Sequence, residues 1–166
     1  MIRKAVLMDL DIIMKILKDT LAEMHSYNNY QWDENYPGKQ DFINDINEGS
    51  LYVYEDNGLV VGFLCINITE PVEYKGLNWS LHEGAYILHR LAVDINHRKE
   101  KVGFKLMQFA EDLAINNKIF YLKADTYSLN TKAQKLIECC GYEYVGTMEL
   151  LNKEKTFYCY EKKLAF

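Results

Sequence analysis

The sequence predicts a mixed α/β domain in which helices flank a largely antiparallel central sheet. Segments with the two-residue alternation of strands follow segments with the spacing of helices along the whole chain. Two pairs of strands are joined by short turns, at Asp56-Asn57-Gly58 and at Asn152-Lys153-Glu154, which indicates antiparallel hairpins. Because 166 residues with 49% hydrophobic content can bury a sizeable core, we expect a single domain over residues 1–166.

In the first half of the chain, a short strand precedes two helices and a hairpin. Asp9 or Asp11 can cap the first helix, and Gly49 suits the end of the second. Asn57-Gly58 marks the hairpin turn, because both residues tolerate a positive φ. The expected elements are a strand at Ile2–Ala5, helices around Ile12–Leu21 and Phe42–Ile46, and strands at Leu51–Glu55 and Val60–Ile68.

In the second half of the chain, a polar loop over residues 69–83 leads into an apolar strand and a long helix. A second helix and a closing hairpin follow. After a strand of mixed alternation, we expect the segment from Asp125 to Leu129 to be a loop. The expected elements are strands at Tyr86–Val93 and Ile119–Ala124, helices at Phe104–Leu113 and Asn130–Cys140, and strands at Tyr144–Leu150 and Thr156–Leu164.

Composition excludes several classes of function. A formal net charge of −5 argues against a general nucleic-acid binder, because such a protein needs a basic face to neutralise phosphates. No apolar run approaches the roughly 20 residues of a membrane helix. The start, Met1-Ile2-Arg3-Lys4, lacks the apolar stretch of a signal peptide. We therefore expect neither a nucleic acid nor a membrane as a partner.

The cysteines and histidines indicate a cytoplasmic protein without a metal site. Cys65, Cys139, Cys140 and Cys159 form no C-x-x-C motif, and the adjacent pair is a poor disulfide. Free thiols in a reducing cytoplasm fit this pattern best. The four histidines show no metal-ligand spacing.

A basic turn lies between the central strand and the helix that follows it. Arg98, Lys99, Lys101 and Lys105 surround the start of that helix. A helix N-terminus already carries partial positive charge and unpaired N–H groups, so basic residues there are unfavourable alone. A bound anion such as phosphate would explain the cluster, and a solvated charged loop is the alternative interpretation.

Two motifs resemble those of the GNAT superfamily of N-acetyltransferases. Residues 98–103, after an apolar strand, resemble motif A, which has a basic residue or Gln, two residues, Gly, one residue, then Gly or Ala. The segment from Asn130 to Tyr142 resembles motif B, which has an Asn, a helix, and a Gly followed by an aromatic residue. The resemblance implies a GNAT-like acyl-CoA N-acyltransferase fold and acetyl transfer from acetyl-CoA to an amine.

Acetyl-CoA is the cosubstrate that this resemblance implies, without a metal. Its pyrophosphate would take N–H donors from the basic turn, and its pantetheine arm would pair with the strand edge, whose N–H groups could also bind the oxyanion. Gly103 either lets the backbone approach phosphate or permits tight packing, and Asn130 is first a helix cap. The implied cofactor-binding residues are Leu91, Ala92, Val93, Arg98, Lys99, Glu100, Lys101, Val102, Gly103, Phe104, Lys105 and Asn130.

Two positions depart from the family pattern. Lys101 stands where motif A has its first Gly, and it would cost about 1–2 kcal/mol if the position needs a positive φ. Ile137 stands where many members have the Tyr that protonates the leaving thiolate. Tyr127 or Cys140 could substitute, and a CoA thiolate can also leave unassisted.

The acceptor ammonium must lose a proton, which requires a general base with a pKa near neutrality. His89 is the first candidate, because it lies on the central strand in alternation with Leu91 and Val93. Glu83 and Tyr86 are the next candidates. A half-buried structural histidine is the alternative interpretation of His89.

The aromatic segment before Pro37 corresponds to the acceptor pocket in the resembling family. Tyr30, Trp32 and Tyr36 are the candidate substrate-binding residues, because aromatic rings can hold an amine by cation–π contacts. Rings that close the edge of the core are the alternative. The acceptor is expected to be a primary amine of a small molecule or peptide. A protein N-terminal acetylase, a non-catalytic acyl-CoA-binding or sensor domain, and a homodimer all stay open.

Overall fold

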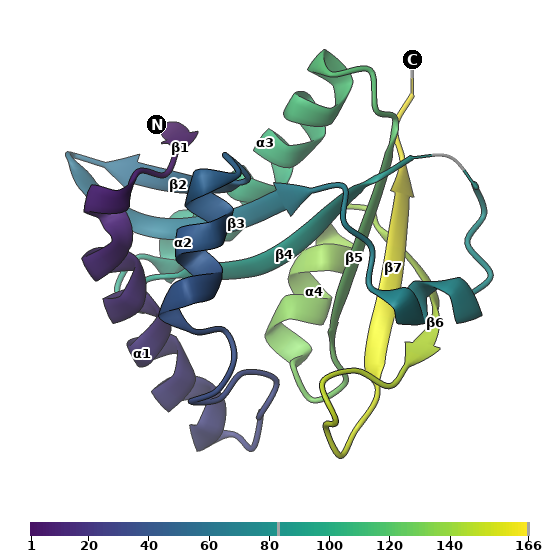
Figure 1. The fold of residues 1–166 in the computed structure, drawn as a ribbon, viewed down its shortest axis with the longest axis horizontal. Coiled ribbons are helices and arrows are strands. Elements are labelled where there is room, and N and C mark those ends of the chain that lie inside the picture. Colours follow the sequence, from purple (N-terminus) through teal and green to yellow (C-terminus); the bar gives the residue numbers. More distant parts are fainter. Residues whose placement is uncertain (83, 166) are drawn as a thin grey trace.

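A computed structural model describes residues 1–82 and 84–165, and it contains a sheet with the strand order β1-β2-β3-β4-β5-β7-β6 (Figure 1). Its strand pairs are antiparallel except for β4 and β5, which confirms the predicted mixed α/β fold class. The elements are β1 (Ile2–Lys4), η1 (Leu7–Asp9), α1 (Leu10–Ser26), α2 (Lys39–Asn47), β2 (Leu51–Asp56), β3 (Leu59–Asn67), η2 (Val72–Gly76), β4 (Tyr86–Val93), η3 (Arg98–Glu100), α3 (Val102–Asn116), β5 (Tyr121–Tyr127), α4 (Thr131–Cys139), β6 (Glu143–Met148) and β7 (Phe157–Lys163).

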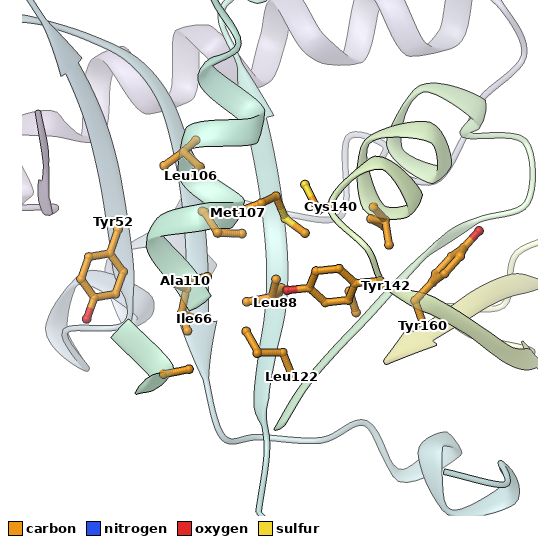
Figure 2. Packing of buried hydrophobic residues seen from close by; sticks show 14 of the residues in the cluster. Tyr52, Ile66, Leu88, Leu106, Met107, Ala110, Leu122, Cys140, Tyr142 and Tyr160 are labelled. Carbon is orange, nitrogen blue, oxygen red and sulfur yellow. The ribbon is translucent and has the colours of Figure 1, made fainter. Parts of the chain in front are cut away.

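Helices cover both faces of the sheet. On one face, α1 and α2 pack on β2 and β3 through fully buried side chains such as Ile13, Phe42 and Phe63. On the other face, α3 and α4 pack on β4 and β5, and Figure 2 shows Leu106, Leu88 and neighbouring side chains of this cluster. Full burial of each such side chain contributes about 1.5–3 kcal/mol, so the two clusters fix the helices on the sheet.

A third cluster lies on the same side of the sheet as α1 and α2, over β5 and β7. Tyr74 and Trp79, from the segment around η2, pack there on Tyr121 and Phe157. The long loop predicted for residues 69–83 therefore contains a short helical turn with a fully buried tyrosine. This turn brings polar groups of the loop onto the end of β5.

The parallel pairing of β4 and β5 is short. It joins only Tyr86–Leu88 to Leu122–Ala124, and the two strands diverge beyond these residues (Figure 1). The second half of β4 therefore has, within the described residues, no strand partner on its β5 side. Such an edge leaves backbone N–H and C=O groups available to a ligand.

Strand β4 also carries a bulge. Cys65 pairs with His89 and Phe63 with Ala92, so that Leu64 faces two residues, and one of them, Arg90, has a φ of 49°. The extra residue places His89 on the face of Cys65, whereas Leu91 and Val93 pack with the α3 cluster on the opposite face. The expectation that His89 alternates with these two residues on one face is wrong, because the bulge interrupts the two-residue period.

Strand β5 is longer than the sequence predicts. It runs to Tyr127, and its last residues, Asp125, Thr126 and Tyr127, pair with Cys159, Tyr158 and Phe157 of β7. The predicted loop from Asp125 to Leu129 is wrong at its start, because pairing with β7 holds polar residues in a strand.

Among the helices of the described segments, none is long and apolar enough to span a membrane.

Candidate active site

A cleft of about 870 Å³ opens where β4 and β5 separate. Its walls come from both faces of the sheet, since residues of α1 and of the segment after it line one side and residues of α3 and α4 the other. Leu88 to Val93 of β4 and Ala124 to Thr126 of β5 form the two lips of the split. A ligand on one face of the sheet can therefore meet a ligand on the other through this opening.

The α3 and α4 side of the cleft carries an excess of positive charge. Arg98, Lys101, Lys132 and Lys135 line it. Glu23 of α1 is their carboxylate partner, and it forms ion pairs with both Arg98 and Lys132. Burial opposes ionisation of Glu23, but hydrogen bonds from these two cations hold its pKa below the usual range. The remaining positive charge favours an anionic group such as phosphate.

Gly103 lets α3 and α4 approach closely at the wall of the cleft. A Cβ atom at this position would lie 3.1 Å from Leu136 Cδ2 and 3.8 Å from Val93 Cγ2, and both of these side chains line the cleft. The glycine therefore permits tight packing, which is one of the two interpretations of this residue from the sequence.

Eight of the twelve residues implied for CoA line the cleft: Leu91, Ala92, Val93, Arg98, Lys101, Gly103, Phe104 and Asn130. The other four lie elsewhere. Lys99 and Glu100 are exposed, and Val102 is fully buried in the core. Lys105 Nζ donates to Tyr54 Oη at 3.1 Å and lies over the Tyr54 ring, so it faces β2 instead of the turn. Lys101 has a φ of 59°, the strained conformation considered for this position.

On the acceptor side, Trp32 and Tyr36 line the cleft, whereas Tyr30 is exposed and stacks on His25 with ring centroids 4.8 Å apart. Trp32 is also only 6% exposed within the α1 cluster, so it packs in the core and borders the cleft at once. Gln31 Oε1 accepts hydrogen bonds from Thr126 and Asn130, which ties this segment to β5 and α4.

Arg90 links the bulge to α2. Its guanidinium donates two hydrogen bonds to Asp45, at 2.8 and 2.7 Å, and a third to Tyr36 Oη at 2.7 Å. Both charged side chains are largely buried, with 13% and 6% exposure. The bulge is therefore held from the acceptor side of the sheet by a paired charge.

The structure places His89 at the split, where burial disfavours the charged form of its imidazole. Asn67 Oδ1 lies 3.1 Å from His89 Nε2 and also accepts the Thr69 N–H, which makes Nε2 the protonated nitrogen. Burial and then the nearby Arg90 lower the pKa of His89 to about 4. A base this weak takes few protons from an ammonium near neutral pH.

Of the other two candidates for the general base, Tyr86 packs on the α3 side and does not line the cleft, and Glu83 lies outside the described residues.

Asp125 is a site residue that the sequence analysis missed. It lines the cleft, and Tyr74 Oη donates a hydrogen bond to its Oδ2 at 2.7 Å. Burial is the main reason why the pKa of Asp125 is raised to about 6. The signal that could have indicated it was a carboxylate directly after the predicted strand Ile119–Ala124, because binding and catalytic residues often lie in loops next to a rigid element.

Neither of the proposed substitutes for the missing tyrosine acid reaches the cleft. Ile137 lines it, but Tyr127 is buried between β5 and β7, and its hydroxyl accepts the Lys155 N–H. Cys140 is buried, and burial raises the pKa of its thiol to about 11.

Within residues 1–82 and 84–165, no group of three or more His, Cys, Asp or Glu side chains could hold a metal ion.

Comparison with known proteins agrees with this architecture. The sequence profile of the acetyltransferase (GNAT) family matches residues 14–142, which is most of the chain, so the protein belongs to that family. The family transfers acetyl groups. No curated protein matches the sequence.

Solved structures show the same fold over the full length. A GNAT-family acetyltransferase from Streptococcus agalactiae aligns with a TM-score of 0.86 and 22% identity, over 100% of this chain and 96% of its own. A ribosomal-protein-alanine N-acetyltransferase from Brucella melitensis gives 0.72 and 21%, over 99% of each chain. YncA of Salmonella typhimurium, determined with its cofactor acetyl-CoA, gives 0.69 and 16%, over 100% and 94%. At these identities the likeness concerns the fold alone.

Proposed function

We propose that this protein is an acetyl-CoA-dependent N-acetyltransferase that acetylates a primary amine of a small molecule or peptide. The observation that carries the proposal is the cleft at the split between β4 and β5. It joins a cationic rim on one face of the sheet to an aromatic and carboxylate-bearing wall on the other. This arrangement suits two ligands of opposite charge that meet at the split.

In this proposal, separate groups of residues bind the cosubstrate and stabilise the developing negative charge. Arg98, Lys101 and Lys132 hold phosphate groups by charge, and Gly103, which lines the cleft without a side chain, lets the backbone approach them. The free edge of β4 beyond Leu88 pairs with an extended amide-containing arm as it would with a peptide strand. Backbone N–H groups of the same edge can stabilise a developing oxyanion. When bound, acetyl-CoA supplies the acetyl group as a thioester.

The test is a screen of primary amines, with acetyl-CoA present and release of free CoA as the readout. The panel contains monoamines, diamines, amino acids and short peptides with free N-termini, so that the best acceptor also separates small-molecule from protein N-terminal acetylation. Thermal melting with and without acetyl-CoA reports binding independently of turnover. Binding without turnover of any amine would contradict the proposal.

A variant pair tests the placement of the cosubstrate. Gly103→Val puts a side chain against Leu136 at the wall of the cleft and should abolish thermal stabilisation by acetyl-CoA. Gly76→Val is the matched control, because a Cβ at Gly76 meets no atom within 4 Å, and it should keep that stabilisation. Far-UV circular dichroism of both variants checks that the fold is intact. Full stabilisation of the Gly103→Val protein would place the ligand elsewhere.

One observation favours a second candidate, a non-catalytic acyl-CoA-binding or sensor domain. Ile137 lines the cleft at the position where many family members have the tyrosine that protonates the leaving thiolate. The two possible substitutes, Tyr127 and Cys140, do not line the cleft. The amine screen decides between the two functions, because a sensor binds acetyl-CoA without releasing CoA faster in the presence of any amine.

A further inference from the structure

Of the described residues, three carboxylates line the cleft: Glu23, Glu70 and Asp125. Glu23 is paired with Arg98 and Lys132. Glu70 Oε1 lies 2.6 Å from the buried Lys123 Nζ, whose charge it neutralises. Asp125 differs from both, because its hydrogen-bond partner is the neutral hydroxyl of Tyr74.

No lysine, arginine or histidine nitrogen of the described residues lies within ion-pair distance of Asp125. A carboxylate can accept about four hydrogen bonds, and Tyr74 supplies one of them at Oδ2. The remaining capacity is available to a ligand in the cleft. A cationic ligand gains most from it, because the charge of Asp125 is the one that the protein does not compensate.

Asp125 also stands at the position where the two ligands would meet. The last pair of the β4–β5 ladder is Leu88 with Ala124, so His89 and Asp125 are the first residues beyond the split. Paired strands lie about 4.8 Å apart, and the separation grows from there. In the alternation of β5, Asp125 shares the face of Lys123, whose Nζ lies 4.5 Å from the centroid of the Trp79 ring, and this is the acceptor face of the sheet.

We propose that Asp125 binds the ammonium group of the acceptor and accepts its proton, and that Tyr74 positions the Asp125 carboxyl group. The inference rests on the proposed acetyltransferase function and names its proton acceptor. The ammonium gives one proton to Asp125, and the freed nitrogen lone pair forms the C–N bond to the thioester carbonyl carbon. The C–S bond breaks with its electron pair on sulfur. The nitrogen then loses a second proton, which the thiolate takes up directly or through water.

The groups around Asp125 support this role. Tyr74 of η2 forms a hydrogen bond with it and Cys159 of β7 is its paired residue, while Glu73 and Tyr36 interact with it electrostatically. Burial raises the pKa of Cys159 to about 12 and raises the pKa values of Tyr36 and Tyr74, so these three groups are neutral near pH 7. Glu73 adds negative charge, and burial together with Glu73 outweighs the Tyr74 hydrogen bond, so that the pKa of Asp125 rises to about 6. A carboxyl group in this range suits proton transfer near neutrality.

His89, on the opposite lip of the split, complements Asp125. It stays neutral near pH 7, because burial and Arg90 lower its pKa to about 4. A neutral imidazole does not repel an incoming ammonium group. At the split, Asp125 on β5 thus serves as the charged proton acceptor, and His89 on β4 forms a polar, uncharged wall opposite it.

The decisive comparison is Asp125→Asn against Asp112→Asn, an exposed aspartate on α3 outside the cleft. With the best amine of the screen, Asp125→Asn should lower kcat/KM by about 10²–10⁴-fold, the usual contribution of a general base. Calorimetry should show weaker binding of the amine to Asp125→Asn, while thermal stabilisation by acetyl-CoA stays at the wild-type value. Asp112→Asn should match the wild type in all three measurements.

Tyr74→Phe tests the positioning role through pH. Loss of the Tyr74 hydrogen bond should raise the pKa of Asp125, because that bond favours the ionised form. The acidic limb of the kcat/KM profile should therefore shift to higher pH. Carbon NMR of aspartate-labelled protein should show a carboxyl group that titrates near pH 6 in the wild type, at higher pH in Tyr74→Phe, and not at all in Asp125→Asn. A titration unchanged by Tyr74→Phe would overturn the positioning role.

The outcomes separate this inference from the proposed function. If the wild type acetylates an amine and Asp125→Asn does so with a kcat/KM within about twofold of it, far short of the loss a general base gives, the function stands and the role of Asp125 is refuted. If the wild type binds acetyl-CoA but acetylates no amine in the panel, the proposed function fails and the proton-transfer role fails with it. A large loss confined to Asp125→Asn, with weaker amine binding, supports both.

Discussion

Replacing Asp125 by asparagine should stabilise the folded protein near pH 7, although it removes the proposed proton acceptor. Burial raises the pKa of Asp125 from 3.8 to about 6 in the folded state, so ionisation of this carboxyl group opposes folding. A shift of about two units corresponds to about 3 kcal/mol at most, and water that reaches the cleft reduces it. Asparagine is neutral, and its amide oxygen can still accept the Tyr74 hydroxyl.

The expected gain in the free energy of unfolding is therefore about 1–3 kcal/mol at pH 7. For a domain of this size, each kcal/mol raises the melting temperature by about 2–4 °C, so the rise should be about 2–12 °C. The gain has a definite pH dependence. It is fully present above the folded pKa near 6, and it declines as the pH falls toward the unfolded value of 3.8, because the wild-type carboxyl group then becomes neutral.

The assay is thermal or urea unfolding of the wild type, Asp125→Asn and Asp112→Asn at several pH values between about 4 and 8, the range that spans the folded and unfolded pKa values. Only the difference between each variant and the wild type is used, so that general acid destabilisation cancels. Equal stability of wild type and Asp125→Asn at pH 7 would refute the argument. A stabilisation of the same size at every pH would also refute it, because its cause would then be packing and not charge.

Three further substitutions have definite expected signs. Lys101→Gly should raise the free energy of unfolding by up to about 1 kcal/mol in urea unfolding, because the relief of the αL strain at φ 59° exceeds the cost of the entropy that glycine adds to the unfolded chain. A loss of stability would contradict this expectation. Tyr142→Phe should raise the stability by about 1 kcal/mol or more, because the Tyr142 hydroxyl is buried in the cluster of Figure 2 and none of the described residues forms a hydrogen bond with it. An unchanged melting curve would indicate a bound water. Glu23→Gln should tighten acetyl-CoA binding about twofold to fivefold in low-salt calorimetry, because it frees Arg98 and Lys132 for phosphate, and the gain should shrink in high salt.

The sequence is sufficient where local signals and the fold coincide. Asn57-Gly58 marks the β2–β3 turn, and both residues do have positive φ values. Asn130 caps α4 through a hydrogen bond from the Ala133 N–H to its side chain, as its residue type predicts. Signals of this kind lie within a few residues of the element they describe, so the sequence analysis reaches them.

The missed features depend on contacts between residues far apart in the chain. Asp125 belongs to a strand only because β7 pairs with it, and its hydroxyl partner, Tyr74, lies 51 residues earlier. The sequence shows the charge of Lys105 but not where its side chain points, because that depends on the hydrogen bond from Lys105 Nζ to Tyr54 Oη on β2. Residue type gives the chemistry of a side chain, whereas tertiary packing decides which site it serves.

The bulge at Arg90 explains why the cleft forms at this place. A bulge bends its strand and increases the local twist, and the β4–β5 pairing ends at Leu88, two residues before Arg90. Arg90 adopts its positive φ while its guanidinium is held by Asp45 of α2. Loss of one member of such a buried pair typically costs about 3–5 kcal/mol, which exceeds the strain of one αL residue, about 1–2 kcal/mol.

Helix α2 thus fixes the bend of β4 through one ion pair, and the bend has two consequences for the site. The edge of β4 separates from β5, and the side chain of His89 turns to the face covered by α1 and α2 instead of the face of Leu91. Asp125 meets that face from β5 at the first position beyond the split. The free edge of β4 and the opening beside it therefore follow from a single interruption in the strand, which no local pattern in the sequence marks.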